Sequence, residues 1–184
     1  MSTSVIPSRT GSDPLPSTQP IGPEPFVVSG THPPTAAGPV LVALDDDDNA
    51  GVLLQHGGSL AERLGVALRV TYVWSDCRPP ECTHHRCCHR DLAEADRLLS
   101  GLLDEHLTSE HAVQVERDVL HHGDPAEALI VLSAPASMLV VGSSSDRPAS
   151  PATLGATTRA ILGRTRCPVM VVPHHTLAAT RVGW

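Results

Sequence analysis

Residues 40–44 read Val-Leu-Val-Ala-Leu and run directly into four consecutive aspartates, Asp45 to Asp48. A short run that is apolar throughout is typical of a strand buried on both faces. Such strands belong to parallel sheets, because the helices that connect parallel strands cover both faces of the sheet. The stretch therefore predicts a parallel α/β architecture with an acidic loop at the carboxyl end of its first strand.

Predicted strands and helices alternate along the chain that follows. The strands are predicted at 40–44, 67–74, 113–120, 138–141 and 168–172, and the helices at 49–65, 90–107, 125–133 and 155–164. Five strands, each expected to be apolar on both faces, with four intervening helices predict a doubly wound parallel sheet. In that architecture a ligand lies beyond the carboxyl ends of the strands, where strand order reverses.

The rest of the chain is expected to lie outside this sheet. Residues 1–38 are rich in Pro, Ser, Thr and Gly and carry few charges, which predicts a disordered tail. The domain is expected over 39–173, with a Cys/His-rich insertion loop at 75–89 and a C-terminal tail at 174–184. The first residues lack the pattern of a secretory signal, and no apolar run is long enough to span a membrane. Five cysteines without a secretory signal then predict a reducing cytoplasm in which the thiols stay free.

Composition excludes several function classes. All 13 basic residues are Arg and none is Lys, so phosphate-binding loops that end in Gly-Lys, protein kinases and lysine Schiff-base enzymes are excluded. The net charge is −7 and aromatic residues make up 2% of the chain. This composition argues against a nucleic-acid ligand, which needs a basic surface and often aromatic platforms.

The acidic run after the first strand has two interpretations. Four carboxylates at this position suggest the magnesium pocket of a receiver domain. That mechanism also needs a Lys near the last strand and an Asp after the third strand. This chain has no Lys, and its third strand is followed by His121, His122 and Gly123, so we reject the receiver domain. Asp48 or Asn49 is then predicted to cap the following helix, and Asp45 remains a candidate ligand-binding residue.

The loop after the fourth predicted strand is the most informative. It reads Val140-Val141-Gly142-Ser143-Ser144-Ser145 and, after nine further residues, Gly155-Ala156-Thr157-Thr158. Glycine at a strand end lets backbone approach a ligand, and small hydroxyl residues that open a helix can hydrogen-bond a phosphate. An ordinary loop and helix cap would explain the same residues, so both interpretations stand.

With these motifs, residues 39 to 173 resemble the universal stress protein (UspA-like) family. The matching stretches are VLVALD ending at Asp45, Gly123-Asp124-Pro125-Ala126, VVGS at 140–143 and RCPVMVV at 166–172. The resemblance implies an adenine nucleotide alpha hydrolase-like sheet with strand order 3-2-1-4-5. It also implies a homodimer through the final strand and a non-catalytic role as a stress-response sensor or regulator. The family contains ATP-binding and non-binding groups.

The family's ATP-binding group carries Gly-x2-Gly-x9-Gly-(Ser/Thr). Gly142 and Gly155 match, whereas Ser145 replaces the middle glycine and Ala156 replaces the hydroxyl residue. By position, the resemblance places two residues at the adenine and ribose end, Asp45 and Val73. It places six around the phosphates: Gly142, Ser145, Gly155, Ala156, Thr157 and Thr158. The two substitutions, and an acidic run that would repel a triphosphate unless Mg²⁺ intervened, predict a degenerate ATP site.

The predicted insertion loop concentrates soft metal ligands. Seven Cys and His side chains fall between residues 77 and 89, and thiolate and imidazole suit Zn²⁺ or Cu(I). The candidate ligands are Cys77, Cys82, Cys87 and His89. A thiol redox sensor, with thiol pKa values lowered by nearby Arg, and an ordinary insertion remain open alternatives. The family does not ordinarily carry this cluster.

Two further pairs of histidines follow predicted strands. His121 and His122 follow the third strand and are possible pocket residues, whereas His174 and His175 are expected to be exposed. No Ser-His-Asp or Cys-His signature is present, so no catalytic residue is assigned.

The alternative to a nucleotide-binding regulator is a dimeric interaction module that does not bind nucleotide and whose Cys/His loop responds to metal or oxidation.

Overall fold

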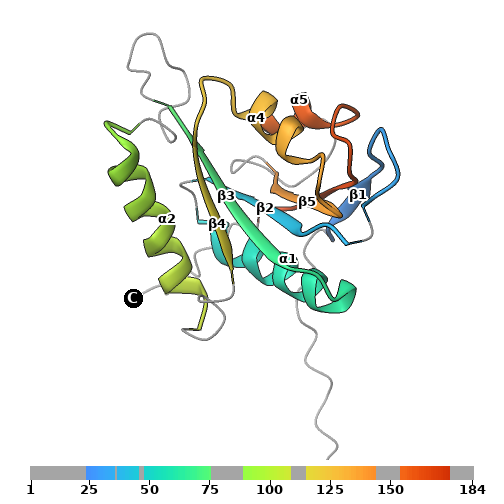
Figure 1. Ribbon diagram of the computed structural model, residues 1–184, viewed down its shortest axis with the longest axis horizontal. Coiled ribbons are helices and arrows are strands. Elements are labelled where there is room, and N and C mark those ends of the chain that lie inside the picture. The colour runs from blue at the N-terminus through green and yellow to red at the C-terminus, as the bar shows by residue number, and fades with distance from the viewer. Residues whose placement is uncertain are drawn as a thin grey trace, which may run out of the picture.

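The computed structural model describes residues 24–35, 37–45, 48–75, 89–108, 115–143 and 154–174. Within these residues, six strands form one sheet with helices on both of its faces (Figure 1). The strands are β1 (Phe26–Val28), β2 (Val40–Leu44), β3 (Leu68–Trp74), β4 (Glu116–His121), β5 (Met138–Gly142) and β6 (Val169–Val172). The helices are α1 (Ala50–Leu64), α2 (Leu92–His106), α4 (Pro125–Leu132) and α5 (Ala156–Ile161). Every element predicted between residues 40 and 172 is present, with ends that differ by a few residues.

The sheet has the predicted doubly wound topology. Its strand order is β1-β6-β5-β2-β3-β4, and all neighbouring strands are parallel except β1 and β6. The chain proceeds from β2 outward to β4, then returns through α4 to the other side of β2 and continues to β6. Strand order therefore reverses between β2 and β5, which confirms the predicted order of the five parallel strands.

Two apolar cores lie on opposite faces of the sheet. Helices α1 and α2 cover one face, and α4 and α5 cover the other (Figure 1). Val40 and Val42 point into the core beneath α1 and α2, whereas Leu41 points into the core beneath α4 and α5. Strand β2 is thus buried on both faces, as its apolar sequence predicts. None of the described helices combines the length and apolarity that a bilayer crossing requires.

Local capping signals set the ends of the helices. The Asp124 carboxylate accepts hydrogen bonds from the backbone N–H groups of Ala126 and Glu127, which confirms the predicted cap of α4. Helix α1 ends at Gly65, whose φ of 66° is the left-handed conformation that glycine adopts freely. The predicted cap of α1 is corrected, because Asn49 holds the capping position without a side-chain capping hydrogen bond.

The segment expected to be a disordered tail contributes a sixth strand. Strand β1 pairs antiparallel with β6, with Phe26 opposite Val171 and Val28 opposite Val169. The prediction of disorder is therefore wrong for residues 26–28, and the sheet has six strands in place of five. A three-residue apolar run has too little propensity to be noticed in a proline-rich segment, and its hydrogen-bond partners come from the edge of β6. That edge is also the one that the implied homodimer would use.

The opposite edge strand is more polar than predicted. Strand β4 begins with Glu116, Arg117 and Asp118, so it is not apolar on both faces. Arg69 on β3 forms ion pairs with Asp118 and Glu116, and the hydrogen bond to Asp118 raises the pKa of the Arg69 guanidinium. An edge strand has one neighbour only, so charged side chains there remain in contact with water.

Candidate functional site

The reversal of strand order brings together Asp45, which follows β2, and Gly142, at the end of β5. Strands β2 and β5 are neighbours, with Val42 opposite Val140, so their carboxyl ends meet at one edge of the sheet. Asp45 follows β2 and is exposed, whereas Gly142 ends β5. Helices α1 and α5 leave this point on opposite faces of the sheet (Figure 1), and doubly wound sheets bind their ligands where strand order reverses in this way.

Gly142, at the end of β5, makes room for Asn49 at the start of α1. A methyl group added at Gly142 would lie 3.0 Å from Nδ2 of Asn49, which is tighter than ordinary van der Waals contact. Gly142 is not among the described glycines with a positive φ, so packing, not backbone conformation, explains the glycine. Asn49 is 2% exposed. The sequence indicated Asn49 only as a helix cap, and nothing local in the sequence signals its contact with β5.

The first turn of α5 is anchored to the end of β5. The hydroxyl of Thr158 donates a hydrogen bond of 2.8 Å to the carbonyl oxygen of Gly142, and Thr158 is 6% exposed. Gly155 precedes the helix with φ −58° and ψ 160°, Ala156 is exposed and Thr157 is half-buried. Ser145 lies outside the described residues. The structure thus brings Gly155, Ala156 and Thr157 near Gly142 and assigns the hydroxyl proton of Thr158 to a structural hydrogen bond.

A second connection ties Ser143, which follows β5, to β6 and to the chain after it. The backbone N–H of His174 donates to Oγ of Ser143 at 2.9 Å, and the N–H of Ser143 donates to the carbonyl oxygen of Val172 at 2.8 Å. His174 is half-buried, so its predicted exposure is wrong, and His175 lies outside the described residues. The sequence suggested exposure because His174 follows the last strand, whereas the hydrogen bond to Ser143 holds it against the sheet.

Aromatic and histidine rings gather at the carboxyl ends of β3 and β4. The ring centroid of Trp74 lies 4.5 Å from that of His121, which is exposed at the end of β4. Val73 is buried, so only its backbone could meet a ligand. In His122, Nδ1 lies 2.7 Å from the carbonyl oxygen of Asp124 and 3.0 Å from its backbone nitrogen. His122 therefore stabilises the turn into α4, whereas the exposed ring of His121 lies against Trp74.

The Cys/His loop leaves and re-enters the sheet at one point. The backbone N–H of His89 donates to the carbonyl oxygen of Ser75 at 3.0 Å, and Nε2 of His89 lies 2.7 Å from the Tyr72 hydroxyl. Three of the predicted metal ligands, Cys77, Cys82 and Cys87, lie outside the described residues. Among the residues that the structure does describe, no group of three or more Cys, His, Asp and Glu could hold a metal ion. His89 could offer only Nδ1 to a metal while Nε2 keeps its contact with Tyr72.

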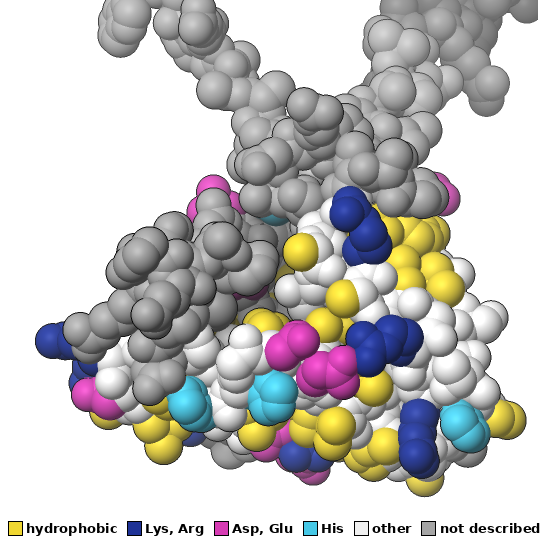
Figure 2. All heavy atoms as spheres, turned by 90° about the horizontal axis from the view of Figure 1, so that it is seen from above, with side chains coloured by type: hydrophobic (Ala, Val, Ile, Leu, Met, Phe, Trp, Pro, Cys, Tyr) yellow, Lys and Arg dark blue, Asp and Glu magenta, His cyan; other side chains and the backbone are white. Residues whose placement is uncertain are grey.

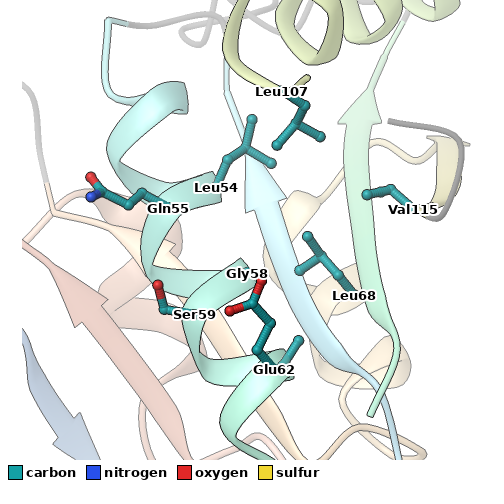
Figure 3. Close-up of a pocket in the computed structure, with 9 residues that line it drawn as sticks. Leu54, Gln55, Gly58, Ser59, Glu62, Leu68, Leu107 and Val115 are labelled. Atoms are coloured by element: carbon teal, nitrogen blue, oxygen red, sulfur yellow. The ribbon is translucent and has the colours of Figure 1, made fainter. Parts of the chain in front are cut away.

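A separate pocket lies near the amino-terminal ends of the strands, away from Asp45 and Gly142. It has a volume of about 270 Å³ and lies between α1, the end of α2 and the amino ends of β3 and β4 (Figure 3). Its lining residues are Leu54, Gln55, Gly58, Ser59, Ala61, Glu62, Leu68, Leu107 and Val115. The side chains of Leu54 and Leu107 point toward one another, and Glu62 is the one ionisable residue among the described residues that line the pocket (Figure 3). Its described lining is remote from Asp45 and Gly142 and contains no pair of chemically active groups.

The face of the molecule that is seen from above is mixed in charge. In the view from above, acidic, basic and histidine side chains lie interspersed among apolar ones (Figure 2). The part of that face which the structure describes has no continuous basic stripe of the kind that nucleic-acid binding requires.

The sheet order defines a doubly wound α/β domain, a class of fold whose ligands bind where strand order reverses. Residues 37–173 match the model of the universal stress protein family, and the chain belongs to that family. This match confirms the resemblance that the sequence motifs indicated. A comparison with the curated proteins finds no match.

Several solved structures share the fold. A Pseudomonas aeruginosa protein described as a universal stress protein has a TM-score of 0.53 and 20% identity, over 81% of this chain and 52% of that chain. A universal stress protein from Archaeoglobus fulgidus has a TM-score of 0.55 and 20% identity, over 73% of this chain and 98% of that one. The universal stress protein from Archaeoglobus fulgidus in complex with dAMP has a TM-score of 0.51 and 23% identity, over 74% of this chain and 98% of that chain. This chain thus spans about half the length of the Pseudomonas protein.

Proposed function

We propose that this protein is a non-catalytic stress-response sensor or regulator that binds ATP with Mg²⁺ at the carboxyl ends of β2 and β5. The observation that carries the proposal is the convergence of Asp45, Gly142 and the start of α5 at the adjacent carboxyl ends of β2 and β5. Ligands of doubly wound sheets bind at such a point. The similar Archaeoglobus fulgidus structure is a complex with dAMP, which supports an adenine nucleotide as the ligand class.

The adenine and ribose would lie near β2 and β3. The Asp45 carboxylate is exposed and can accept hydrogen bonds from ribose hydroxyls or an adenine amino group. Val73 would contribute backbone groups, because its side chain is buried in the core. Mg²⁺ takes oxygen ligands, and the carboxylates of residues 45–48 and the phosphates offer them. Bound there, the ion would offset the repulsion between the acidic run and the triphosphate.

The phosphates would depend on backbone N–H groups and hydroxyls. The chain has no Lys, and the Thr158 hydroxyl already donates to Gly142. Gly142, Gly155, Ala156 and Thr157 are left to surround the phosphates, together with Ser145. Each family position that this chain replaces removes either space or a donor, so we expect weak binding.

Isothermal titration calorimetry with Mg²⁺–ATP tests the proposal. The intact chain should bind weakly, and the double variant Ser145→Gly/Ala156→Ser should bind at least about fivefold more tightly, because a restored hydrogen bond is worth about 1 kcal/mol. Asp45→Ala should weaken binding, whereas Asp104→Ala, which removes an exposed carboxylate from α2, should leave it unchanged. If neither the intact chain nor the double variant binds millimolar nucleotide, the proposal is wrong.

The absence of catalysis is a separate part of the proposal. Among the described residues at the carboxyl ends of β2 and β5, no nucleophile lies beside a general base. Bound ATP should therefore remain intact over hours. Chromatography of the released nucleotide measures this, and steady turnover to ADP would contradict it. We also propose a cytoplasmic location, where the five cysteines would stay reduced.

A second candidate function rests on the closed base of the Cys/His loop. Because Ser75 and His89 hold its two ends together, a metal or an oxidant acting within residues 76–88 could alter contacts with a partner through Trp74 and His121. Metal analysis of protein purified without a histidine tag tests the metal form. Thiol counts before and after peroxide test the redox form. Metal well below one ion per chain, with thiols unchanged, would remove this candidate.

A further inference from the structure

Helix α1 has a gap in one row of its side chains. Leu54, Gly58 and Glu62 are spaced four residues apart, so they lie in one row along the helix. Figure 3 shows Leu54 and Glu62 on either side of Gly58. A methyl group added to Gly58 would meet nothing within 4 Å. The glycine therefore leaves a hollow between the two larger side chains.

Neither the backbone nor the packing of α1 requires a glycine at position 58. Gly58 is not among the described glycines with a positive φ, and alanine would favour the helix more. The adjacent Gly57 is different, because a methyl group there would overlap Cγ2 of Val42. What Gly58 provides is space, and that space belongs to the pocket between α1 and the amino ends of β3 and β4.

The walls of this pocket are largely apolar. Leu54 is buried, and Leu68, Leu107 and Val115 on the facing elements are half-buried. The pocket volume is about 270 Å³. An engineered apolar cavity of about 150 Å³ is large enough to bind benzene. The pocket of this chain therefore has room for one six-membered ring with a short side chain.

One carboxylate lies beside these apolar walls. Glu62 is exposed, and the ion pairs formed among the described residues use other carboxylates. The remaining polar lining residues that the structure describes, Gln55 and Ser59, carry no charge. Ligand pockets typically combine apolar walls with a few polar groups that select the ligand. A carboxylate in that place selects a positively charged group.

We propose that this pocket binds a small apolar molecule that carries a positively charged amine. The apolar part would fill the gap at Gly58 and lie against Leu54 and Leu68, with the ammonium group beside Glu62. Such a ligand matches the pocket in size, in polarity and in charge. The pocket is separate from the carboxyl ends of β2 and β5, so the proposal does not depend on nucleotide binding.

Nuclear magnetic resonance titrations of the full-length chain with three probes test the proposal. The probes are 2-phenylethylamine, 2-phenylethanol and phenylacetate, which share the ring and differ in charge. The amides of Gly58 and Leu68 should shift with the amine. The amine should bind at least about threefold more tightly than the alcohol, and phenylacetate most weakly, as expected for one partly solvated ion pair.

Glu62→Gln isolates the contribution of charge. The variant keeps the shape of the side chain, so the alcohol should bind as it does to the intact chain. The amine should lose its advantage and bind with the affinity of the alcohol. If the amine and the alcohol bind the intact chain equally, or if Glu62→Gln leaves the preference unchanged, the assignment to a cationic ligand is wrong.

Gly58→Leu isolates the contribution of space. Leucine should fill the hollow and weaken all three probes by about tenfold or more, because the ring can no longer be buried. Gly101→Leu is the matched control in α2, where a methyl group also meets nothing within 4 Å, and it should leave binding unchanged.

Thermal unfolding shows whether each variant is folded. If Gly58→Leu does not fold, Gly58→Ala narrows the same hollow and should weaken the probes by a smaller factor. No shift of the intact chain with any probe at millimolar concentration would overturn the proposal, because another part of the chain or a wall that closes would then fill the pocket. Unchanged binding by both Gly58 variants would place the probes elsewhere and would overturn it too.

Discussion

The Thr158 hydroxyl donates its proton to the carbonyl oxygen of Gly142, 2.8 Å away, and so fastens the first turn of α5 to the end of β5. The family resemblance places both residues around the phosphates of a bound nucleotide. In this chain their contact with one another holds the loop between β5 and α5 at its two ends. A buried donor and acceptor that satisfy each other also make this contact expensive to remove.

Thr158→Val should therefore lower the free energy of unfolding by about 1–3 kcal/mol, because the Gly142 carbonyl loses its buried partner. Thr158→Ser keeps the hydroxyl and should lose less. Urea denaturation followed by circular dichroism measures both. A smaller loss for Thr158→Val than for Thr158→Ser would show that the methyl group, not the hydrogen bond, stabilises the protein here.

Gly142→Ala should strain the contact with Asn49. The new methyl group would lie 3.0 Å from Nδ2 of Asn49, and the buried side chain has little room to yield. We expect a loss of about 1–3 kcal/mol in stability, as in other overpacked sites. The double variant Gly142→Ala/Asn49→Gly should recover part of it in thermal unfolding, and no recovery would place the strain elsewhere.

Two adjacent glycines in α1 should respond in opposite directions to alanine. A methyl group on Gly57 would overlap Cγ2 of Val42 on the neighbouring strand, whereas one on Gly58 meets nothing within 4 Å. Gly58→Ala should stabilise the protein by up to about 1 kcal/mol, because alanine favours a helix. Gly57→Ala should destabilise it despite the same gain in propensity.

Urea denaturation of the two variants, under identical conditions, checks this pair. Each serves as the control for the other, because helix, residue type and chemical change are the same. Stabilisation by both substitutions would mean that α1 can move away from Val42.

Cys167 should react slowly with alkylating reagents and should make stability depend on alkaline pH. It is 1% exposed, and burial raises the pKa of its thiol to about 11. The folded state thus resists ionisation, so its contribution is complete below the unfolded pKa of about 8.5 and is lost as pH rises towards 11.

Unfolding free energies measured from pH 8 to 11 should fall more steeply for the intact protein than for Cys167→Ala. At pH 8, alkylation of Cys167 by iodoacetamide should be slower than in urea by a factor of about a hundred or more, since the thiolate fraction drops tenfold per pKa unit. Rapid labelling of Cys167 in the folded protein would contradict its burial.

The sequence predicted elements whose causes are local. The apolar run of β2 and the Asp124 cap of α4 contain their own signals, and the structure confirms both. The paired parallel strands follow from the alternation of such elements. Motif resemblance then supplied the strand order, which composition and periodicity alone do not determine.

What the sequence missed depends on partners distant along the chain. Strand β1 exists because β6 has a free edge, and Asn49 is buried because Gly142, on another strand, lacks a side chain. The family resemblance implies a place for Thr158 beside the phosphates, yet only the fold shows that the Gly142 carbonyl is within reach of its hydroxyl. Residue type identifies what a side chain can bind, and tertiary structure decides which of the possible partners it meets.

The closed base of the Cys/His loop has a practical consequence. Ser75 and His89 are joined by a 3.0 Å backbone hydrogen bond, so the two ends of the intervening segment stay together whatever that segment contains. The free-energy cost of closing a loop grows only slowly with its length. This position is therefore suited to grafting: a reporter peptide, an affinity epitope or a small folded domain could replace residues 76–88 while β3 and α2 keep their places.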